Sequence, residues 1–208
     1  MAKTCREVHV RPLSIISGET SKMGDKNTKG QTSYDVSIVR PQMHSEDFKM
    51  RGRGMKPPRL KAVKKGLLTL HTLELMATTI YRFQITGENC DFNRQLIAAM
   101  CNEMTHYQDF QIKLYEFGFK PSVTRLAFWF AGFAFGFGSR LLGKKAILKT
   151  GIWVETKAVH HYAELLNTVD WDEDTRKVIE KDQADEDGHI SKWKKLLEVS
   201  GEEKDKTA

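Results

Sequence analysis

The feature that most restricts the fold is a pair of Glu-x-x-His motifs, each preceded by a lone glutamate. The six residues are Glu74, Glu103, His106, Glu155, Glu186 and His189. The lone glutamate precedes its motif by 29 residues in the first half and by 31 in the second. Residues three apart on an α-helix lie about 60° apart around its axis, so the Glu and His of each motif face the same way. The near-equal separations predict two similar helical hairpins.

Apolar residues recur at helical spacing in four long stretches. We expect helices over residues 59–85, 92–116, 142–166 and 171–199. Asn89 or Asp91 would cap the second helix, and Asp170 with Glu173 resembles a capping box at the start of the fourth. Because no β pattern competes with these helices, the predicted fold is all-α, a four-helix bundle.

The polar composition of the chain's ends sets the predicted domain limits. Residues 1–57 are rich in Gly, Ser and Lys, and we interpret them as a flexible N-terminal arm with a short strand-like piece at 34–41. Pro57 and Pro58 are typical of a first helical turn. The bundle would occupy residues 58–200, followed by a disordered tail over 201–208.

The six residues have the composition of a site for a carboxylate-bridged pair of iron or manganese ions. Four carboxylates balance the charge of two divalent cations. Without metal, four acids in a bundle core would cost several kcal/mol each or would take up protons. The alternative is six solvated surface residues, but Glu74 and Glu155 have apolar neighbours. We therefore predict a metal site.

Three further residues could support this site. Asp185 precedes His189 by four residues and could steady an imidazole of the site, or it could be an ordinary surface acid. Tyr81 and Tyr162 each follow a lone glutamate by seven residues, so each should share that glutamate's helix face. They could line a dioxygen or substrate pocket, or they could be ordinary core tyrosines.

The cysteine content and the charge exclude several classes of protein. Three cysteines without a C-x-x-C pair indicate a reducing compartment, with neither a disulfide scaffold nor a zinc ribbon. The net charge is +6, and residues 117–154 contain no Asp or Glu. No apolar stretch near Met1 is typical of a secretory signal. The basic stretches indicate either nucleic acid or an anionic membrane surface as a partner.

The segment 126–138 favours the membrane. It contains six aromatic residues between Phe128 and Phe137, with basic residues on both sides, but it is shorter than the roughly 20 apolar residues that span a bilayer. We predict a short amphipathic helix over 126–137 at the mouth of a substrate channel. The residues expected to face lipid or a dimer contact are Phe128, Trp129, Phe133 and Phe137. An oligomer interface or a core plug is the alternative.

Several segments resemble the demethoxyubiquinone hydroxylase family. The first helix is similar to the family's H-x-x-E pattern and the positions that follow it, at His71, Glu74, Ala77, Ile80, Tyr81 and Gln84. Residues 131–146 resemble the family's Gly-rich hydrophobic segment before the third helix. Residues 154–162 resemble its third-helix ligand motif, in which a histidine near the Glu belongs to the active site.

The resemblance implies a ferritin-like di-iron monooxygenase of ubiquinone biosynthesis. Its reaction would be the hydroxylation of a polyprenyl benzoquinol by O2, with electrons from NADH. The six residues above would hold two iron ions, with manganese as a substitute, and His161 and Tyr162 would act in catalysis.

The same resemblance implies where the protein works. The lipid-soluble quinol requires peripheral attachment through 126–138, on the cytoplasmic face of a bacterial inner membrane or at the mitochondrial inner membrane of a eukaryote. It also allows a homo-oligomer, or a complex with other proteins of quinone biosynthesis.

Two other functions are compatible with parts of the sequence. One is a ferritin- or rubrerythrin-like ferroxidase or peroxidase, although no rubredoxin-like C-x-x-C module is present and such a protein has little reason to expose aromatic residues. The other is a non-enzymatic basic bundle on membranes or nucleic acid. Aromatic and basic residues are not interleaved as in a nucleic-acid module, so we expect no nucleic-acid partner.

Overall fold

The computed structural model describes residues 43–205, and contacts divide the chain between Phe48 and Lys49. Within the first unit, the structure describes a single 3-10 turn, η1 (Ser45–Asp47). The described part of the second unit contains five helices: α2 (Pro57–Gln84), α3 (Asp91–Glu116), α4 (Arg125–Leu141), α5 (Lys144–Thr168) and α6 (Glu173–Asp205). The strand-like piece predicted at 34–41 and most of the predicted arm lie outside the described residues.

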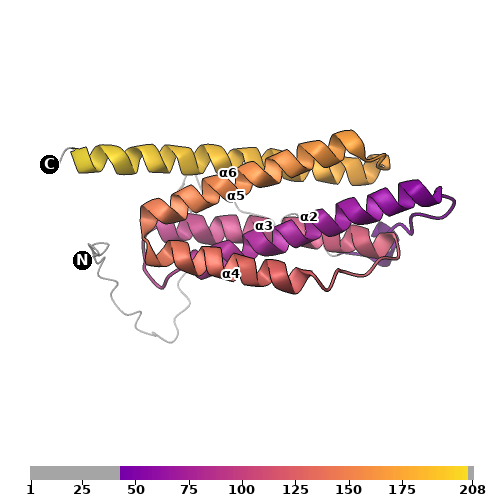
Figure 1. The fold of residues 1–208 in the computed structure, drawn as a ribbon, viewed down its shortest axis with the longest axis horizontal. Helices are drawn as coiled ribbons and strands as arrows, with labels where there is room; N and C mark the ends of the chain where they lie inside the picture. Colours follow the sequence, from indigo (N-terminus) through magenta and orange to yellow (C-terminus); the bar gives the residue numbers. More distant parts are fainter. Residues whose placement is uncertain (1–42, 206–208) are drawn as a thin grey trace, which may run out of the picture. The chain divides into compact units, whose positions relative to one another are not determined.

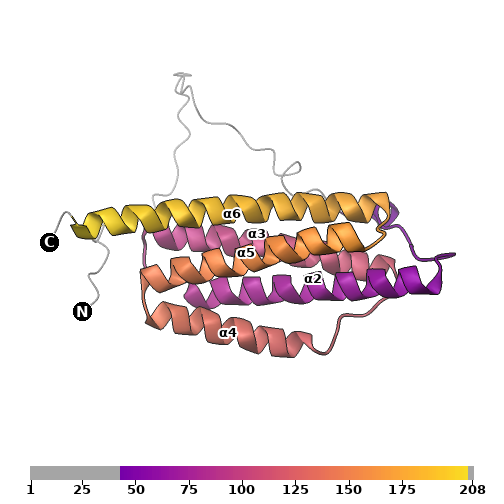
Figure 2. The same ribbon diagram turned by 45° about the horizontal axis from the view of Figure 1, so that its top comes forward.

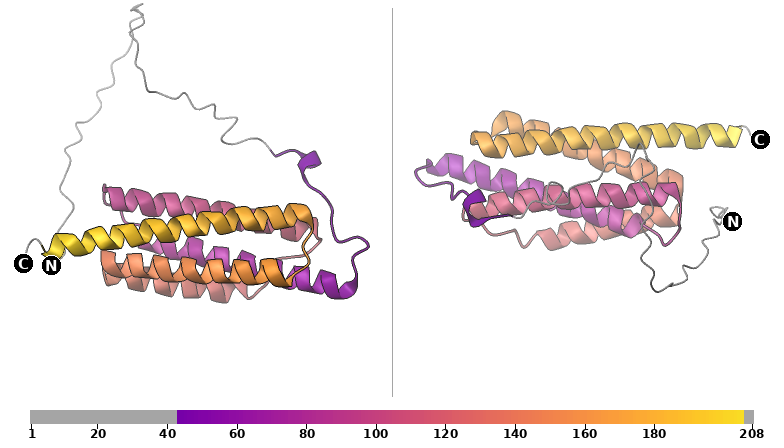
Figure 3. Two further views of the ribbon diagram at one scale, coloured as in Figure 1. Left: turned by 90° about the horizontal axis from the view of Figure 1, so that it is seen from above. Right: turned by 180° about the vertical axis from the view of Figure 1, so that it is seen from behind.

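The four long helices of the second unit lie side by side as two antiparallel hairpins (Figures 1 and 2). α2 packs against α3, and α5 packs against α6. α4 connects the two hairpins and packs on α2, on the outer side of the bundle (Figure 2). The views from above and from behind show the same arrangement (Figure 3). The predicted all-α bundle with a hydrophobic helix between its second and third long helices is confirmed.

The helix ends differ in detail from the sequence-based limits. α3 begins after Cys90, whose side chain makes no capping hydrogen bond, so neither Asn89 nor Asp91 is the cap. α6 begins after Asp172, whose Oδ1 accepts the backbone N–H of Thr175 at 3.2 Å. The capping box predicted at Asp170 is therefore wrong, because Asp170 forms an ion pair with Arg59 instead.

Residues near both predicted domain limits also belong to the helical unit. α6 continues to Asp205, so the part of the predicted tail up to 205 is helical, and 206–208 lie outside the described residues. At the other end, Arg51 precedes α2 and donates to Glu116 of α3 at 2.7 Å and to Asp174 of α6 at 3.0 Å. The side chains of Arg51 and Glu116 are largely shielded from water, at 12% and 4% exposed. Through Glu116 and Asp174, Arg51 links the end of α3 to the start of α6.

The core consists of two apolar clusters. One contains Leu67, Phe110 and Ile179, and the other contains Leu96 and Trp193. On each of the four long helices, the residues of one cluster come before the predicted ligand positions in sequence and those of the other come after. The fold therefore places the predicted ligands in a buried layer with apolar side chains at both ends.

Two glycines allow α4 to lie directly on α2. A Cβ atom at Gly132 would be 2.7 Å from the carbonyl oxygen of Met76, and one at Gly136 would be 2.4 Å from that of Ile80. Both distances are shorter than any van der Waals contact with carbon. Gly132 and Gly136 thus face the bundle, and most of the large side chains of α4 lie on its outer surface.

Candidate metal centre

The six predicted ligands come together in the buried layer. The two helical hairpins supply three of them each. α2 contributes Glu74 and α5 contributes Glu155, while each Glu-x-x-His motif lies on one of the partner helices, α3 and α6. The four carboxylates and His106 are buried, and the His189 side chain is 13% exposed. The helical periodicity that predicted a shared face for each motif is therefore realised in the folded chain.

The six side chains form two overlapping groups whose ligand atoms lie within 4.8 Å of one another. One group contains Glu74, Glu103, His106 and Glu186, and the other contains Glu103, Glu155, Glu186 and His189. Glu103 and Glu186 belong to both groups, whereas each remaining residue belongs to one. Two metal ions in these groups would share Glu103 and Glu186, and each would take one further Glu and one His.

The chemistry of the donor atoms fits metal ions better than it fits a closed hydrogen-bond network. Both carboxylate oxygens of Glu103, one oxygen each of Glu155 and Glu186, and Nδ1 of His189 are buried and have no hydrogen-bond partner. Nδ1 of His189 lies 3.0 Å from Oε1 of Glu103, yet the two atoms do not form a hydrogen bond. Since buried polar atoms are nearly always satisfied in native proteins, these atoms are available to a bound cation.

The electrostatics of the metal-free cluster are unfavourable. Burial, followed by the charges of neighbouring carboxylates, raises the pKa of Glu103 and of Glu155 well above the usual value. Burial alone would lower the pKa of His106, but hydrogen bonds with Glu186 and Glu74 outweigh it and raise the pKa to about 11. Burial lowers the pKa of His189 to about 4. The layer thus disfavours four charged carboxylates unless protons or cations neutralise them.

Two tyrosines hold the lone glutamates across the bundle. Tyr162 of α5 donates from its hydroxyl to Oε1 of Glu74 at 2.6 Å, and Tyr81 of α2 donates to Oε1 of Glu155. Trp193 in turn donates to the Tyr81 hydroxyl at 2.8 Å. Burial raises the pKa of both tyrosines well above the usual value, so both remain donors. Each tyrosine therefore orients the glutamate of the opposite helix.

Two aspartates of α6 contact the outer nitrogen of His106. Oδ2 of Asp185 lies 3.2 Å from Nε2, and Oδ1 of Asp182 lies 3.9 Å from it. Asp185 therefore lies beside an imidazole of the cluster, although that imidazole is on α3. Asp182 was not singled out from the sequence. Its spacing of four residues before Glu186, which puts both on one helix face, was the available signal.

Two other histidines of the family-like motifs lie outside both ligand groups. Nε2 of the buried His71 lies 2.9 Å from Oε1 of Gln111, and its ring lies 4.4 Å from that of Tyr107. His161, which was predicted to act in catalysis, has a 41% exposed side chain that lies 3.8 Å from Glu164 on the same helix. The structure brings Tyr162 to the centre but does not bring His161 there.

A helical bundle with four inward glutamates and two inward histidines defines the class of ferritin-like carboxylate proteins, and the buried cluster could bind metal ions. The model of the family described as "Ubiquinone biosynthesis protein COQ7" matches residues 63–198. The chain therefore belongs to the COQ7 family, which implies a hydroxylase of ubiquinone biosynthesis. No individual curated protein matches the chain.

Proposed function

We propose that this protein is a di-iron monooxygenase that uses O2 to hydroxylate the ring of a polyprenyl benzoquinol, with electrons derived from NADH. The observation that carries the proposal is the pair of ligand groups that share Glu103 and Glu186. Family membership supports the same pathway, and the unpartnered buried oxygens support a bound pair of cations. Manganese fits the same oxygen and nitrogen donors and would be a substitute for iron.

The bound iron pair would supply the redox chemistry that activates dioxygen. The protein's part is to hold the donors still. Tyr162 and Tyr81 orient the carboxylates of Glu74 and Glu155, and Asp185 accepts from Nε2–H of His106, which leaves Nδ1 facing Glu186 at 3.1 Å. The apolar clusters above and below keep bulk water out of the layer.

The test of this function is to load the purified chain anaerobically with ferrous iron, measure its metal content, and supply a reduced short-chain benzoquinol with air. We expect two irons per chain and a product heavier by one oxygen atom, and we expect Glu155→Ala to form no product. Absence of bound metal in the loaded wild type would refute the proposal. Rapid consumption of peroxide without a hydroxylated product would instead favour the ferroxidase or peroxidase.

We also propose that α4 attaches the protein to the surface of the membrane that holds the quinol. No described helix is long and apolar enough to span a membrane. The large apolar side chains exposed on α4 are Leu126, Phe130, Phe133, Phe135, Phe137 and Leu141. Phe128 and Trp129 are partly buried, so the outward set differs from the four residues predicted from the sequence. Exposed cations lie at the two ends of α4 and at the start of α5, and they favour anionic headgroups: Arg125, Arg140, Lys144 and Lys145.

Replacing Leu126, Phe130 and Phe137 by Ser should release the protein from liposomes that contain anionic lipid, while its iron content stays the same. These side chains are 63%, 63% and 43% exposed, so their loss removes contact with lipid and little core packing. The matched control replaces Ile97, Met104 and Tyr115 of α3, which are 40%, 51% and 56% exposed. Equal sedimentation of both variants with liposomes would show that α4 does not attach the protein to lipid.

A membrane-attached hydroxylase of this kind would work on the cytoplasmic face of a bacterial inner membrane, or on the mitochondrial inner membrane of a eukaryote. A second copy of the chain, or other proteins of quinone biosynthesis, would be its partners there. Sedimentation of the protein with inner-membrane vesicles from cells that express it tests this location. Recovery of the protein only in the supernatant would contradict it.

A further inference from the structure

A narrow slot between α2 and α5 is lined by Glu74, a candidate ligand, and by side chains that reach the protein surface. Its walls are Leu73, Met76 and Ala77 of α2 and Trp153, Val154, Lys157 and Ala158 of α5, and Glu74 lines it as well. Glu74 is 1% exposed, whereas Trp153 is 44% exposed, so the slot runs between a buried ligand candidate and the surface. With a volume of about 20 Å³, it has room for about one water molecule.

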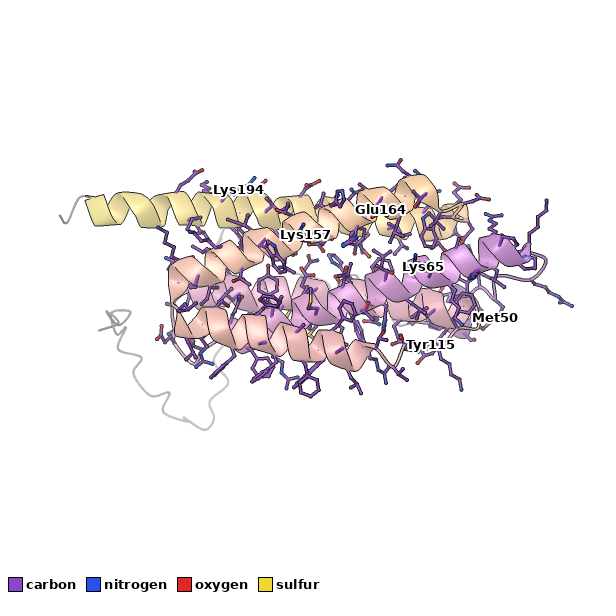
Figure 4. The ribbon with its side chains drawn as sticks, viewed as in Figure 1. Met50, Lys65, Tyr115, Lys157, Glu164 and Lys194 are labelled. Carbon is purple, nitrogen blue, oxygen red and sulfur yellow. The ribbon has the colours of Figure 1, made fainter. Side chains whose placement is uncertain are left out.

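The mouth of the slot contains two side chains that suit a quinol head group. Trp153 and Lys157 are four residues apart on α5, so they lie one above the other on the same face of the helix. Figure 4 marks Lys157 midway along α5. Among the described residues, no acidic side chain forms an ion pair with Lys157. Its ammonium group is therefore available to a ligand.

The mouth also adjoins the aromatic face of α4. The ring of Phe135 lies 5.2 Å from that of Trp153, and both side chains are exposed. A molecule that leaves a lipid surface along α4 would therefore meet Trp153 before it meets Glu74. Trp153 also lines the slot, so a rotation of its side chain changes the width of the mouth.

We infer that Trp153 and Lys157 form the head-group recognition site of the substrate, at the entrance of a route between α2 and α5. The inference rests on the proposed function. The indole of Trp153 stacks on the flat benzoquinol ring, and the ammonium group of Lys157 donates to a ring oxygen. Leu73, Met76 and Ala77 offer the opposite, apolar wall. The ligand that the proposed function brings to this mouth is a para-oxygenated aromatic ring with an apolar tail.

The experiment measures binding of a benzoquinone with one isoprene unit to the metal-free chain, by ultrafiltration and absorbance of the retained quinone. We expect Trp153→Ala and Lys157→Gln each to weaken binding about tenfold. Trp153→Phe should stay within about threefold of the wild type because it keeps an aromatic face. The controls Tyr115→Ala and Lys194→Gln, exposed residues of α3 and α6 that are labelled in Figure 4, should bind as the wild type does.

Catalysis provides a second measurement. In the iron-loaded enzyme, Lys157→Gln should raise KM by the same factor as the dissociation constant and leave kcat nearly unchanged. If both Trp153→Ala and Lys157→Gln bound the quinone with wild-type affinity, these two residues would not form the recognition site. The inference would also be wrong if the wild type did not bind the quinone. Iron content and hydroxylated product from the wild type judge the proposed function separately, since neither depends on the affinity ratio between variants.

Discussion

Replacing Glu103 by Gln should abolish binding of the iron pair and, at the same time, raise the stability of the metal-free protein. Glu103 belongs to both ligand groups, and neither of its carboxylate oxygens has a partner in the described structure. Without metal its charge is buried beside those of Glu155, Glu186 and Glu74. An amide of the same shape removes this repulsion and donates to a neighbouring carboxylate. We expect a gain of about 1–4 kcal/mol in the free energy of unfolding.

The gain should depend on pH in a definite direction. Burial raises the pKa of Glu103 above the 4.5 of an unperturbed Glu, so the folded chain binds a proton that the unfolded chain has lost above that pH. The stability of the metal-free wild type therefore falls as pH rises above about 4.5, by at most about 1.4 kcal/mol per pH unit for one group. Gln does not titrate. The advantage of the variant should be small at pH 4.5 and larger at pH 8.

Denaturant unfolding at pH 5 and pH 8, with and without ferrous iron, measures both effects. The expected pattern is a reversal: Glu103→Gln is more stable than the wild type without iron, and less stable than the wild type with iron. Glu180→Gln is the control, because Glu180 lies on α6 and pairs with Arg176 with half its side chain exposed. If iron stabilised Glu103→Gln as much as the wild type, Glu103 would not be a bridging ligand.

Two glycines of α4 should respond in opposite directions to the same substitution. A Cβ atom at Gly136 would lie 2.4 Å from the carbonyl oxygen and 3.0 Å from the Cα atom of Ile80, and backbone atoms cannot move aside as a side chain can. Gly136→Ala should therefore push α4 away from α2 and cost about 2 kcal/mol or more. A Cβ atom at Gly138 meets nothing within 4 Å. Gly138→Ala should stabilise the helix by about 0.5–1 kcal/mol.

Denaturant unfolding of the two variants measures these opposite changes in stability. Each variant differs from the wild type by the same Gly-to-Ala substitution. Because Gly136 is two residues from Gly138 on one helix, an effect of helix propensity alone would stabilise both variants. Stabilisation of Gly136→Ala would therefore contradict the direct packing of α4 on α2. Iron content should be retained in Gly138→Ala, since α4 contributes no residue to either ligand group.

The sequence by itself determined the four long helices and the six side chains that cluster between them. Helical periodicity is a local property, so the motif spacing places Glu103 with His106, and Glu186 with His189, on common faces before any tertiary contact forms. Apolar neighbours on the same faces then require those faces to be buried. Their burial without metal is costly, and this links the pattern to a cation pair. Gly132 and Gly136 likewise recur at a spacing that one helix face presents to α2.

Only the tertiary structure decided which helices face each other and which side chains meet. Tyr81 follows Glu74 on α2, yet it donates to Glu155, and Tyr162 of α5 donates to Glu74. Residue spacing within one helix determines which side chains share a face. A hydrogen-bond partner on another helix depends on how the two helices are rotated and shifted against each other, and the spacing within either helix does not determine that. For the same reason, Asp185 contacts His106 of α3.

The same distinction explains why His161 lies outside the centre and which side chains of α4 face outward. His161 is next to Tyr162 in sequence, but adjacent residues on a helix point about 100° apart, so one reaches the centre while the other remains 41% exposed. On α4, an aromatic run without alternation could turn any side outward, and the contact of Gly132 and Gly136 with α2 selected the side. The sequence thus determined which carboxylate and imidazole side chains are buried together, and helix packing determined the geometry of that cluster.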